Sequence, residues 1–249
     1  MSFQNGKEIS ANEPAVVYED ADVLAVNKPP GLAVHADGKT EEPTLADWIL
    51  ERSPSLASVG DANVTPYGVT LARPGIVHRL DRQTSGIMVI AKNQKAFEFL
   101  KNEFKNRRVK KTYRAFVYGK LPEAQGTITL PIGKSRKDFP LWSAEKDARG
   151  TLREAVTEYC ALAETPQFSY VEVSPKTGRT HQIRVHCKAL RHPIVCDPLY
   201  APNRPCELGF TRLALHALSL ELTLPSGARV KLETSLPDDF LRALELLSH

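Results

Sequence analysis

A continuous apolar run at residues 87–91 constrains the fold most strongly. Its length and composition predict a buried β-strand, which follows a polar turn at residues 83–86. Immediately before this turn, Arg79 and Arg82 flank Asp81. Opposite charges a few ångströms away lower the pKa of an Asp, so we expect Asp81 to be ionised. It is therefore suited to act as a nucleophile or as an electrostatic anchor.

Short strands separated by turn residues dominate the rest of the pattern. The predicted strands are residues 16–20, 23–28, 87–92, 111–118, 127–132, 154–162, 168–174, 213–224 and 228–234. The predicted helices start at Thr44, cover residues 96–104 and 179–190, and start again near Pro237. Because hairpins outnumber regular alternations of strand and helix, this order predicts an α+β fold with a largely antiparallel mixed sheet flanked by helices.

The length of 249 residues is compatible with one catalytic domain or with two closely merged halves. We expect a single domain over residues 1–249. Residues 1–13 are expected to form a flexible N-terminus, and the charged segment 133–150 a long loop or insertion that takes part in substrate selection.

Composition excludes several classes of protein. The longest apolar stretches have the length of strands, so no membrane partner is expected, and the N-terminus lacks the apolar core of a signal peptide. We therefore expect a cytoplasmic protein. The four cysteines are widely spaced and contain no C-x-x-C pair, so we expect reduced thiols and no metal site.

The net charge of +4 is weak support for a polyanionic partner, but the distribution of cations is more informative. A basic span follows the segment that contains Asp81. Its cations are Lys101, Lys105, Arg107, Arg108, Lys110, Lys111 and Arg114. Such runs are usually solvated faces, but this one lies between two segments assigned to the site, where phosphate contacts would position a substrate.

An isolated Arg-x-Asp-Arg pattern is most often a paired surface turn, but here the similarity extends much further. Residues 73–86 resemble the catalytic motif of the RluA-type pseudouridine synthases. Further similar segments are residues 27–32, 34–35, 111–113, 176–184, 192–195 and 197–200. The resemblance implies a pseudouridine-synthase catalytic domain, in the form that lacks the extra N-terminal RNA-binding domain.

The resemblance also implies catalytic roles. Asp81 matches the nucleophile that isomerises uridine to pseudouridine in RNA, and Arg184 matches the arginine that pairs with it. Tyr113 matches the tyrosine that packs against the target base, although a half-buried strand residue is the simpler interpretation of its position. The base that removes the final proton from carbon 5 stays open between Tyr113 and Asp81.

Five further residues are candidates for substrate binding. Arg79 matches an arginine that occupies the space left by the flipped uridine, and Arg179 is assigned a substrate or structural role. His78, Lys28 and Lys111 complete this set, Lys28 as a possible phosphate contact.

The isomerisation consumes nothing, so we expect neither a nucleotide cofactor nor a redox or metal cofactor. The expected partner is tRNA and/or rRNA, and the expected state is a monomer. Two alternatives remain open. A non-catalytic RNA-binding module would bind RNA without turnover, and a glycoside hydrolase would need a second carboxylate about five ångströms from Asp81.

Overall fold

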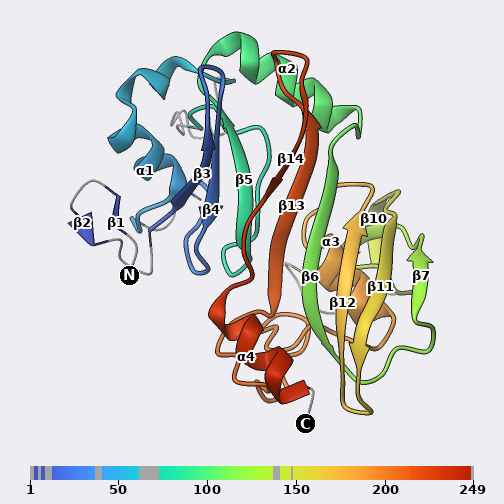
Figure 1. Cartoon of the computed structure of the whole chain (residues 1–249). Coiled ribbons are helices and arrows are strands. Elements are labelled where there is room, and N and C mark those ends of the chain that lie inside the picture. Colours follow the sequence, from blue (N-terminus) through green and yellow to red (C-terminus); the bar gives the residue numbers. More distant parts are fainter. Residues whose placement is uncertain are drawn as a thin grey trace. The chain divides into compact units, whose positions relative to one another are not determined.

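A computed structural model describes residues 13–36, 41–61, 73–136, 141–146 and 148–247, together with the backbone of two short strands, β1 (Phe3–Gln4) and β2 (Lys7–Glu8). Most of the expected flexible N-terminus, residues 1–13, therefore lies outside the described residues. The chain divides into two compact units (Figure 1). Unit 1 comprises Met1–Val109 and Ser219–Thr234, and unit 2 comprises Lys110–Leu218 and Ser235–His249.

Unit 1 is built around the strand predicted from the apolar run. Strand β5 (Ser85–Ala91) is buried at every position, and it pairs antiparallel with β4 (Val23–Lys28). Strand β3 (Ala15–Glu19) pairs with the other edge of β4. The hairpin and the buried strand are thus confirmed.

The helices of unit 1 begin where capping residues predict. Thr44 caps α1 (Leu45–Arg52) in a capping box with Asp47, and Asn93 caps α2 (Gln94–Lys105) through a bond from Ala96 N. A short 3₁₀ helix, η1 (Pro54–Ser58), follows α1. The remaining strand is β14 (Arg229–Glu233), which pairs with the second half of β13 (Leu215–Thr223).

Unit 2 contains a second antiparallel arrangement. Strand β12 (Phe168–Pro175) pairs with β6 (Lys110–Tyr118) on one side and with β11 (Thr157–Glu164) on the other. The edge strand β7 (Gln125–Ile128) pairs with β11. The hairpin expected at residues 154–174 is confirmed. The α+β class is confirmed as well, with four helices among the described residues.

Successive side chains of each strand point to opposite faces of this sheet, and a helix packs on each face. Helix α3 (Gln182–Ala189) reaches the face of Thr157, whose hydroxyl lies 2.8 Å from His186 Nδ1. Helix α4 (Asp238–Leu247) covers the other face, where the Phe240 ring lies 5.6 Å from the Phe116 ring. Arg179 precedes α3, so the expected helix start at residue 179 is wrong. His181, with a φ of 55°, ends the preceding loop.

The segment expected to be a loop at residues 133–150 instead contains a small sheet. Its strands β8 (Ile132–Ser135), β9 (Trp142–Ser143) and β10 (Ala148–Arg153) are ordered β10-β8-β9. These strands form because their apolar side chains are buried in a small core. In this core Ile132 and Ala144 pack with residues of α3 and of the segment after it. Residues 137–140 and 147 lie outside the described residues.

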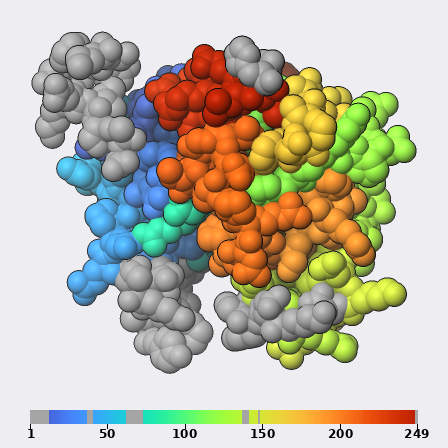
Figure 2. All heavy atoms as spheres, turned by 90° about the horizontal axis from the view of Figure 1, so that it is seen from below, coloured from blue at the N-terminus to red at the C-terminus, as the bar shows by residue number. Residues whose placement is uncertain are grey.

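The expectation of four reduced thiols is also wrong. Cys196 and Cys206 form a disulfide with their Cα atoms 4.5 Å apart, whereas Cys160 and Cys187 are free. The bridge closes a loop in the segment between α3 and β13, which forms a broad part of one face of unit 2 (orange in Figure 2). Tyr118 holds the same loop: Cys196 N donates to its hydroxyl oxygen at 3.2 Å, and the hydroxyl donates to Pro205 O.

Candidate active site

Asp81 lies in a loop of unit 1 that is held in place by its backbone. The residue is half-buried, and its carbonyl accepts a bond from Thr84 N at 3.1 Å just before β5 begins. The next residue, Arg82, accepts from Gly31 N at 2.9 Å through its carbonyl and donates to Gly31 O at 2.9 Å through Nε. The predicted turn therefore presents Asp81 from a loop that is fixed at the residues following it, Arg82 and Thr84.

Lys28 contributes to the same attachment and is not an exposed cation. Its side chain is fully buried. The ammonium donates to Pro29 O at 2.8 Å, Leu32 O at 2.8 Å and Arg82 O at 3.2 Å. A lysine inside the protein can satisfy its three donors with such carbonyls. These bonds make Lys28 a support of the Asp81 loop, and its phosphate contact stays a prediction.

The neighbouring histidine also has structural contacts. Val89 N donates to His78 Nε2 at 3.0 Å, and the imidazole stacks on Phe104 with ring centroids 4.4 Å apart. A nitrogen that accepts a bond carries no proton, so the other nitrogen, Nδ1, holds the proton of the neutral ring. Arg79 is exposed, which is compatible with substrate contact. The substrate roles of His78 and Arg79 stay predictions.

His35 is a neutral group near this loop. Burial lowers its pKa, and the charges of Arg73 and Arg79 lower it further. A neutral imidazole offers no net charge to a phosphate.

In unit 2, Tyr113 is a half-buried residue of β6 placed opposite Val173 of β12. Its side chain therefore points to the sheet face that α3 covers. Two residues earlier, Lys111 donates from Nζ to Thr177 O at 2.9 Å. This bond ties β6 to the loop that precedes α3.

Gln182 organises that loop, since its side chain makes four bonds. Its carbonyl oxygen accepts from Thr177 Oγ1 at 2.6 Å and from Arg179 N at 3.0 Å. Its amide nitrogen donates to Val156 O at 3.0 Å and to Thr157 Oγ1 at 2.9 Å. Arg179 adds a bond from Nε to Glu154 O at 2.9 Å. These contacts support a structural part in the role predicted for Arg179.

Arg184 is held by a carboxylate that sequence analysis did not select. Its Nε donates to Asp197 Oδ2 at 2.8 Å and its NH2 group donates to Asp197 Oδ1 at 2.7 Å, with side-chain exposures of only 5% and 0%. The same carboxylate accepts from Leu199 N and Tyr200 N at 2.9 and 3.0 Å. A planar guanidinium bound at two points has a fixed orientation.

Tyr200 is the second residue that sequence analysis missed. Its ring lies 5.1 Å from the Arg184 guanidinium carbon, and its hydroxyl lies 2.9 Å from His181 Nδ1. Asp197 and Tyr200 both belong to the similar segment 197–200, so the resemblance contained the signal that could have identified them. Their function depends on three-dimensional contacts with α3.

The predicted catalytic residues are thus distributed over both units. Asp81 belongs to unit 1, whereas Tyr113 and Arg184 belong to unit 2. Within unit 2, Arg184 is fixed by Asp197 and Tyr113 lies on the face that α3 covers. The pairing of Asp81 with Arg184 stays a prediction.

Many cations of the basic span at residues 101–114 are already bound within the protein. Lys101 pairs with Asp61 at 2.7 Å, and Arg108 pairs with Glu103 at 2.6 Å. In unit 2, Arg114 pairs with Glu172. Each internal pair reduces the charge available to a phosphate, so this region is a weaker RNA surface than its composition predicts.

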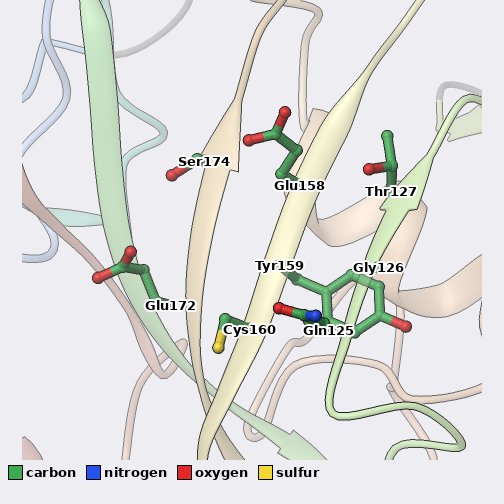
Figure 3. A pocket seen from close by; sticks show the side chains of 8 residues that line it. All are labelled: Gln125, Gly126, Thr127, Glu158, Tyr159, Cys160, Glu172 and Ser174. Atoms are coloured by element: carbon green, nitrogen blue, oxygen red, sulfur yellow. The ribbon is translucent and has the colours of Figure 1, made fainter.

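An open pocket of about 440 Å³ lies on β7, β11 and β12 (Figure 3). Its charged lining residues are Glu158 and Glu172, which pair with Lys176 and Arg114. By strand alternation these glutamates point to the face opposite α3. None of the residues predicted to be catalytic lines this pocket.

The described residues offer little alternative chemistry. No group of three or more His, Cys, Asp or Glu side chains among them is arranged to hold a metal ion. Burial raises the pKa of Cys187 to about 12, which keeps this thiol protonated and unreactive. No helix within the described segments is both long and apolar enough to cross a membrane.

Comparisons with known proteins agree on one family. The model for RNA pseudouridylate synthase matches residues 22–189, which include Asp81, Tyr113 and Arg184. The chain is 37% identical to the uncharacterized RNA pseudouridine synthase YlyB of Bacillus subtilis, over 93% of this chain and 72% of that protein. It is 38% identical to ribosomal large subunit pseudouridine synthase D of Neisseria meningitidis, over 93% of this chain and 60% of that protein.

The fold is similar to that of a solved human protein, RNA pseudouridylate synthase domain containing 1. The TM-score is 0.73 at 29% identity, and the alignment covers 97% of this chain and 90% of the human chain.

Proposed function

Because this chain belongs to the RNA pseudouridine synthase family, a family of isomerases, we propose that it converts specific uridines of rRNA and/or tRNA into pseudouridine with Asp81 as the nucleophile. The observation that carries the assignment of Asp81 is its position in a loop that is fixed at the next residue, Arg82. Arg82 exchanges two bonds with Gly31, and its carbonyl also accepts from the buried Lys28 ammonium. A reactive carboxylate must be held in place in this way to attack one atom of a bound base or sugar.

The reaction breaks the bond between ribose carbon 1 and ring nitrogen 1 and forms a bond from the same sugar carbon to ring carbon 5. The carboxylate of Asp81 attacks either the base ring or the sugar and is released at the end, so no atom of the enzyme is lost. The proton on carbon 5 leaves and a proton is added at nitrogen 1, so the reaction is balanced without a co-substrate. Arg184, oriented by Asp197, would stabilise the carboxylate in its ionised form.

The target uridine must leave its stack before the ring can turn, so we propose that it is flipped out of the RNA. A flipped base loses its stacking and pairing partners, and an aromatic side chain compensates for that loss. Tyr113 is the proposed aromatic residue, since it is half-buried on β6 and Lys111 ties its strand to the loop before α3.

Large-subunit ribosomal RNA is the first substrate to test because relatives of this chain are named for the ribosomal large subunit. Unmodified transcripts of this RNA and of tRNA would be incubated with the wild type and with Asp81→Asn, and pseudouridine would be mapped by chemical labelling. We expect one or a few modified sites with the wild type and none with Asp81→Asn, at unchanged RNA affinity.

Asp61→Asn is the matched control, since it removes a carboxylate from the same unit at an exposed ion pair. It should retain wild-type activity. RNA binding without any product from the wild type would contradict the proposal and favour a non-catalytic RNA-binding module. Wild-type activity in Asp81→Asn would contradict the nucleophile.

A further inference from the structure

The small sheet β8-β9-β10 of unit 2 has four cations on its strands or directly next to them. They are Lys134, Arg136, Arg149 and Arg153. Three of them are exposed, and Lys134 is half-buried. None pairs with a carboxylate of the described residues. Clustered like charges repel one another, and a polyanion would relieve this repulsion.

Strand register aligns part of this set on one face. Lys134 lies opposite Arg149 on one side and opposite Trp142 on the other, so the three side chains form a row across the strands. The Lys134 ammonium lies 4.0 Å from the centroid of the Trp142 ring. This cation–π contact positions the charge without neutralising it.

The row is anchored to the element that carries Arg184. Trp142 packs against the core that contains Val185 of α3 and Tyr200, and Trp142 N donates to the Tyr200 hydroxyl at 3.4 Å. The Tyr200 ring in turn lies 5.1 Å from the Arg184 guanidinium and 5.8 Å from the Lys188 ammonium. Tyr200 and Arg184 are themselves buried, so these contacts fix the small sheet to α3, while the half-buried Trp142 and the cations of the sheet remain at the surface.

We propose that the small sheet is the surface that binds the RNA strand next to the target uridine, with Arg149, Arg153 and Lys134 on its phosphates. This inference rests on the proposed function and identifies where its substrate is held. Exposed arginines on an edge strand can contact a phosphate at two points and remain charged at all working pH values. The ion-paired cations Lys101 and Arg108, on and just after α2, would contribute much less.

The test compares two double substitutions with the same loss of charge. Arg149→Gln/Arg153→Gln removes two exposed cations of β10, and Lys101→Gln/Arg108→Gln, the α2 variant, removes the two ion-paired cations on and just after α2. Binding to a fluorescent transcript of large-subunit ribosomal RNA would be measured by anisotropy between 50 and 300 mM KCl, concentrations chosen to expose the salt dependence.

We expect the β10 variant to weaken binding roughly tenfold and to reduce the slope of log K against log salt by about 1.5 to 2. The α2 variant should change the affinity by less than about twofold. In turnover, the β10 variant should raise KM while kcat stays unchanged, because these residues are not at the reacting atoms. Arg149→Lys/Arg153→Lys keeps the charge and should restore most of the slope.

An unchanged salt slope in the β10 variant, or an equal loss in the α2 variant, would overturn the proposal. Failure of the proposed function is distinguishable from this result. If the wild type makes no pseudouridine, but only the β10 variant binds RNA more weakly than the wild type, the RNA-binding surface is supported and the enzyme assignment fails. If the wild type is active and the β10 variant matches it in binding and KM, only the surface assignment fails.

Discussion

The helix α2 of unit 1 and the small sheet of unit 2 are both rich in cations, but they use them differently. On and after α2, Lys101 pairs with Asp61 and Arg108 pairs with Glu103. On the small sheet, Lys134, Arg149 and Arg153 have no carboxylate partner among the described residues. Two cations of the first region are thus bound to carboxylates of the protein, whereas these three cations of the second region are available to a ligand.

The comparison shows why a count of cations along the sequence is a poor guide to a nucleic-acid surface. An internal carboxylate partner lowers the local potential, and its position depends on the fold. Cations are more closely spaced in residues 101–114 than in residues 134–153, yet the second segment is the better candidate for phosphate binding.

The largest expected effect concerns the buried ion pair between Arg184 and Asp197. Asp197→Asn should destabilise the protein by about 3–5 kcal/mol, because it leaves the guanidinium of Arg184 in the core without its carboxylate. Urea denaturation at neutral pH measures this loss. Asp61→Asn is the control, and its exposed pair with Lys101 should contribute less than about 1 kcal/mol. Equal losses from both variants would remove the distinction between buried and exposed pairs.

A pH titration tests a third kind of group, one that burial keeps uncharged. Burial, and to a smaller extent the charge of Arg212, lower the pKa of His216 to about 3, although Arg212 also pairs with Asp239 at 2.7 Å. An unfolded histidine has a pKa of about 6.5, so the unfolded state takes up the proton first as the pH falls. Stability from this group is therefore complete above pH 6.5 and is lost progressively toward the folded pKa.

Between pH 7 and pH 5 the expected loss from His216 is about 2 kcal/mol. Denaturation curves at both pH values, for the wild type and for His216→Leu, measure it. The variant should have the shallower pH dependence. Identical dependence in the two proteins would show that His216 titrates normally in the folded state.

Much of the fold was predictable because its signals are local. The apolar run of β5 and the Thr44–Asp47 capping box need no distant partner to be recognised. The small sheet was missed because its strands are only two to six residues long and its pairing is irregular between Arg149 and Arg153. Such strands are stabilised by the core that they share with α3.

For the candidate site, sequence motifs identified segments better than they identified the role of each side chain. The motif that contains Lys28 gives no sign that its ammonium donates to Arg82 O, 54 residues away. Asp197 was left out because nothing near it in the sequence marks Arg184 as its partner. Cys196 and Cys206 are ten residues apart, and only the folded loop brings them together.

Two single substitutions compare a cation that is paired with a carboxylate, Arg108, with one that has no such partner among the described residues, Arg153. Arg108→Gln should cost about 1 kcal/mol of stability, because Glu103 is buried while Arg108 itself is 55% exposed and partly screened by water. Its effect on RNA affinity should be small. Arg153→Gln should change stability by less than about 0.5 kcal/mol and weaken RNA binding roughly threefold. Thermal melting and anisotropy on the same preparations measure both quantities, and the reverse pattern would invalidate the comparison.

The smallest expected effect concerns an exposed carboxylate of unit 1 that holds two cations. Glu19 lies 2.9 Å from Lys92 Nζ and 3.0 Å from Arg52, and the Lys92 bond chiefly holds its pKa below the usual 4.5. The folded state thus binds this proton less readily than the unfolded state, so the stabilisation is present above pH 4.5 and is lost as the pH falls through the folded pKa. Glu19→Gln should flatten the stability profile between pH 5 and pH 3 by less than about 0.5 kcal/mol. We expect the RNA affinity of Glu19→Gln at neutral pH to equal that of the wild type. A gain in affinity on freeing Lys92 and Arg52 from Glu19 would show that ion pairing alone had kept this region from binding RNA.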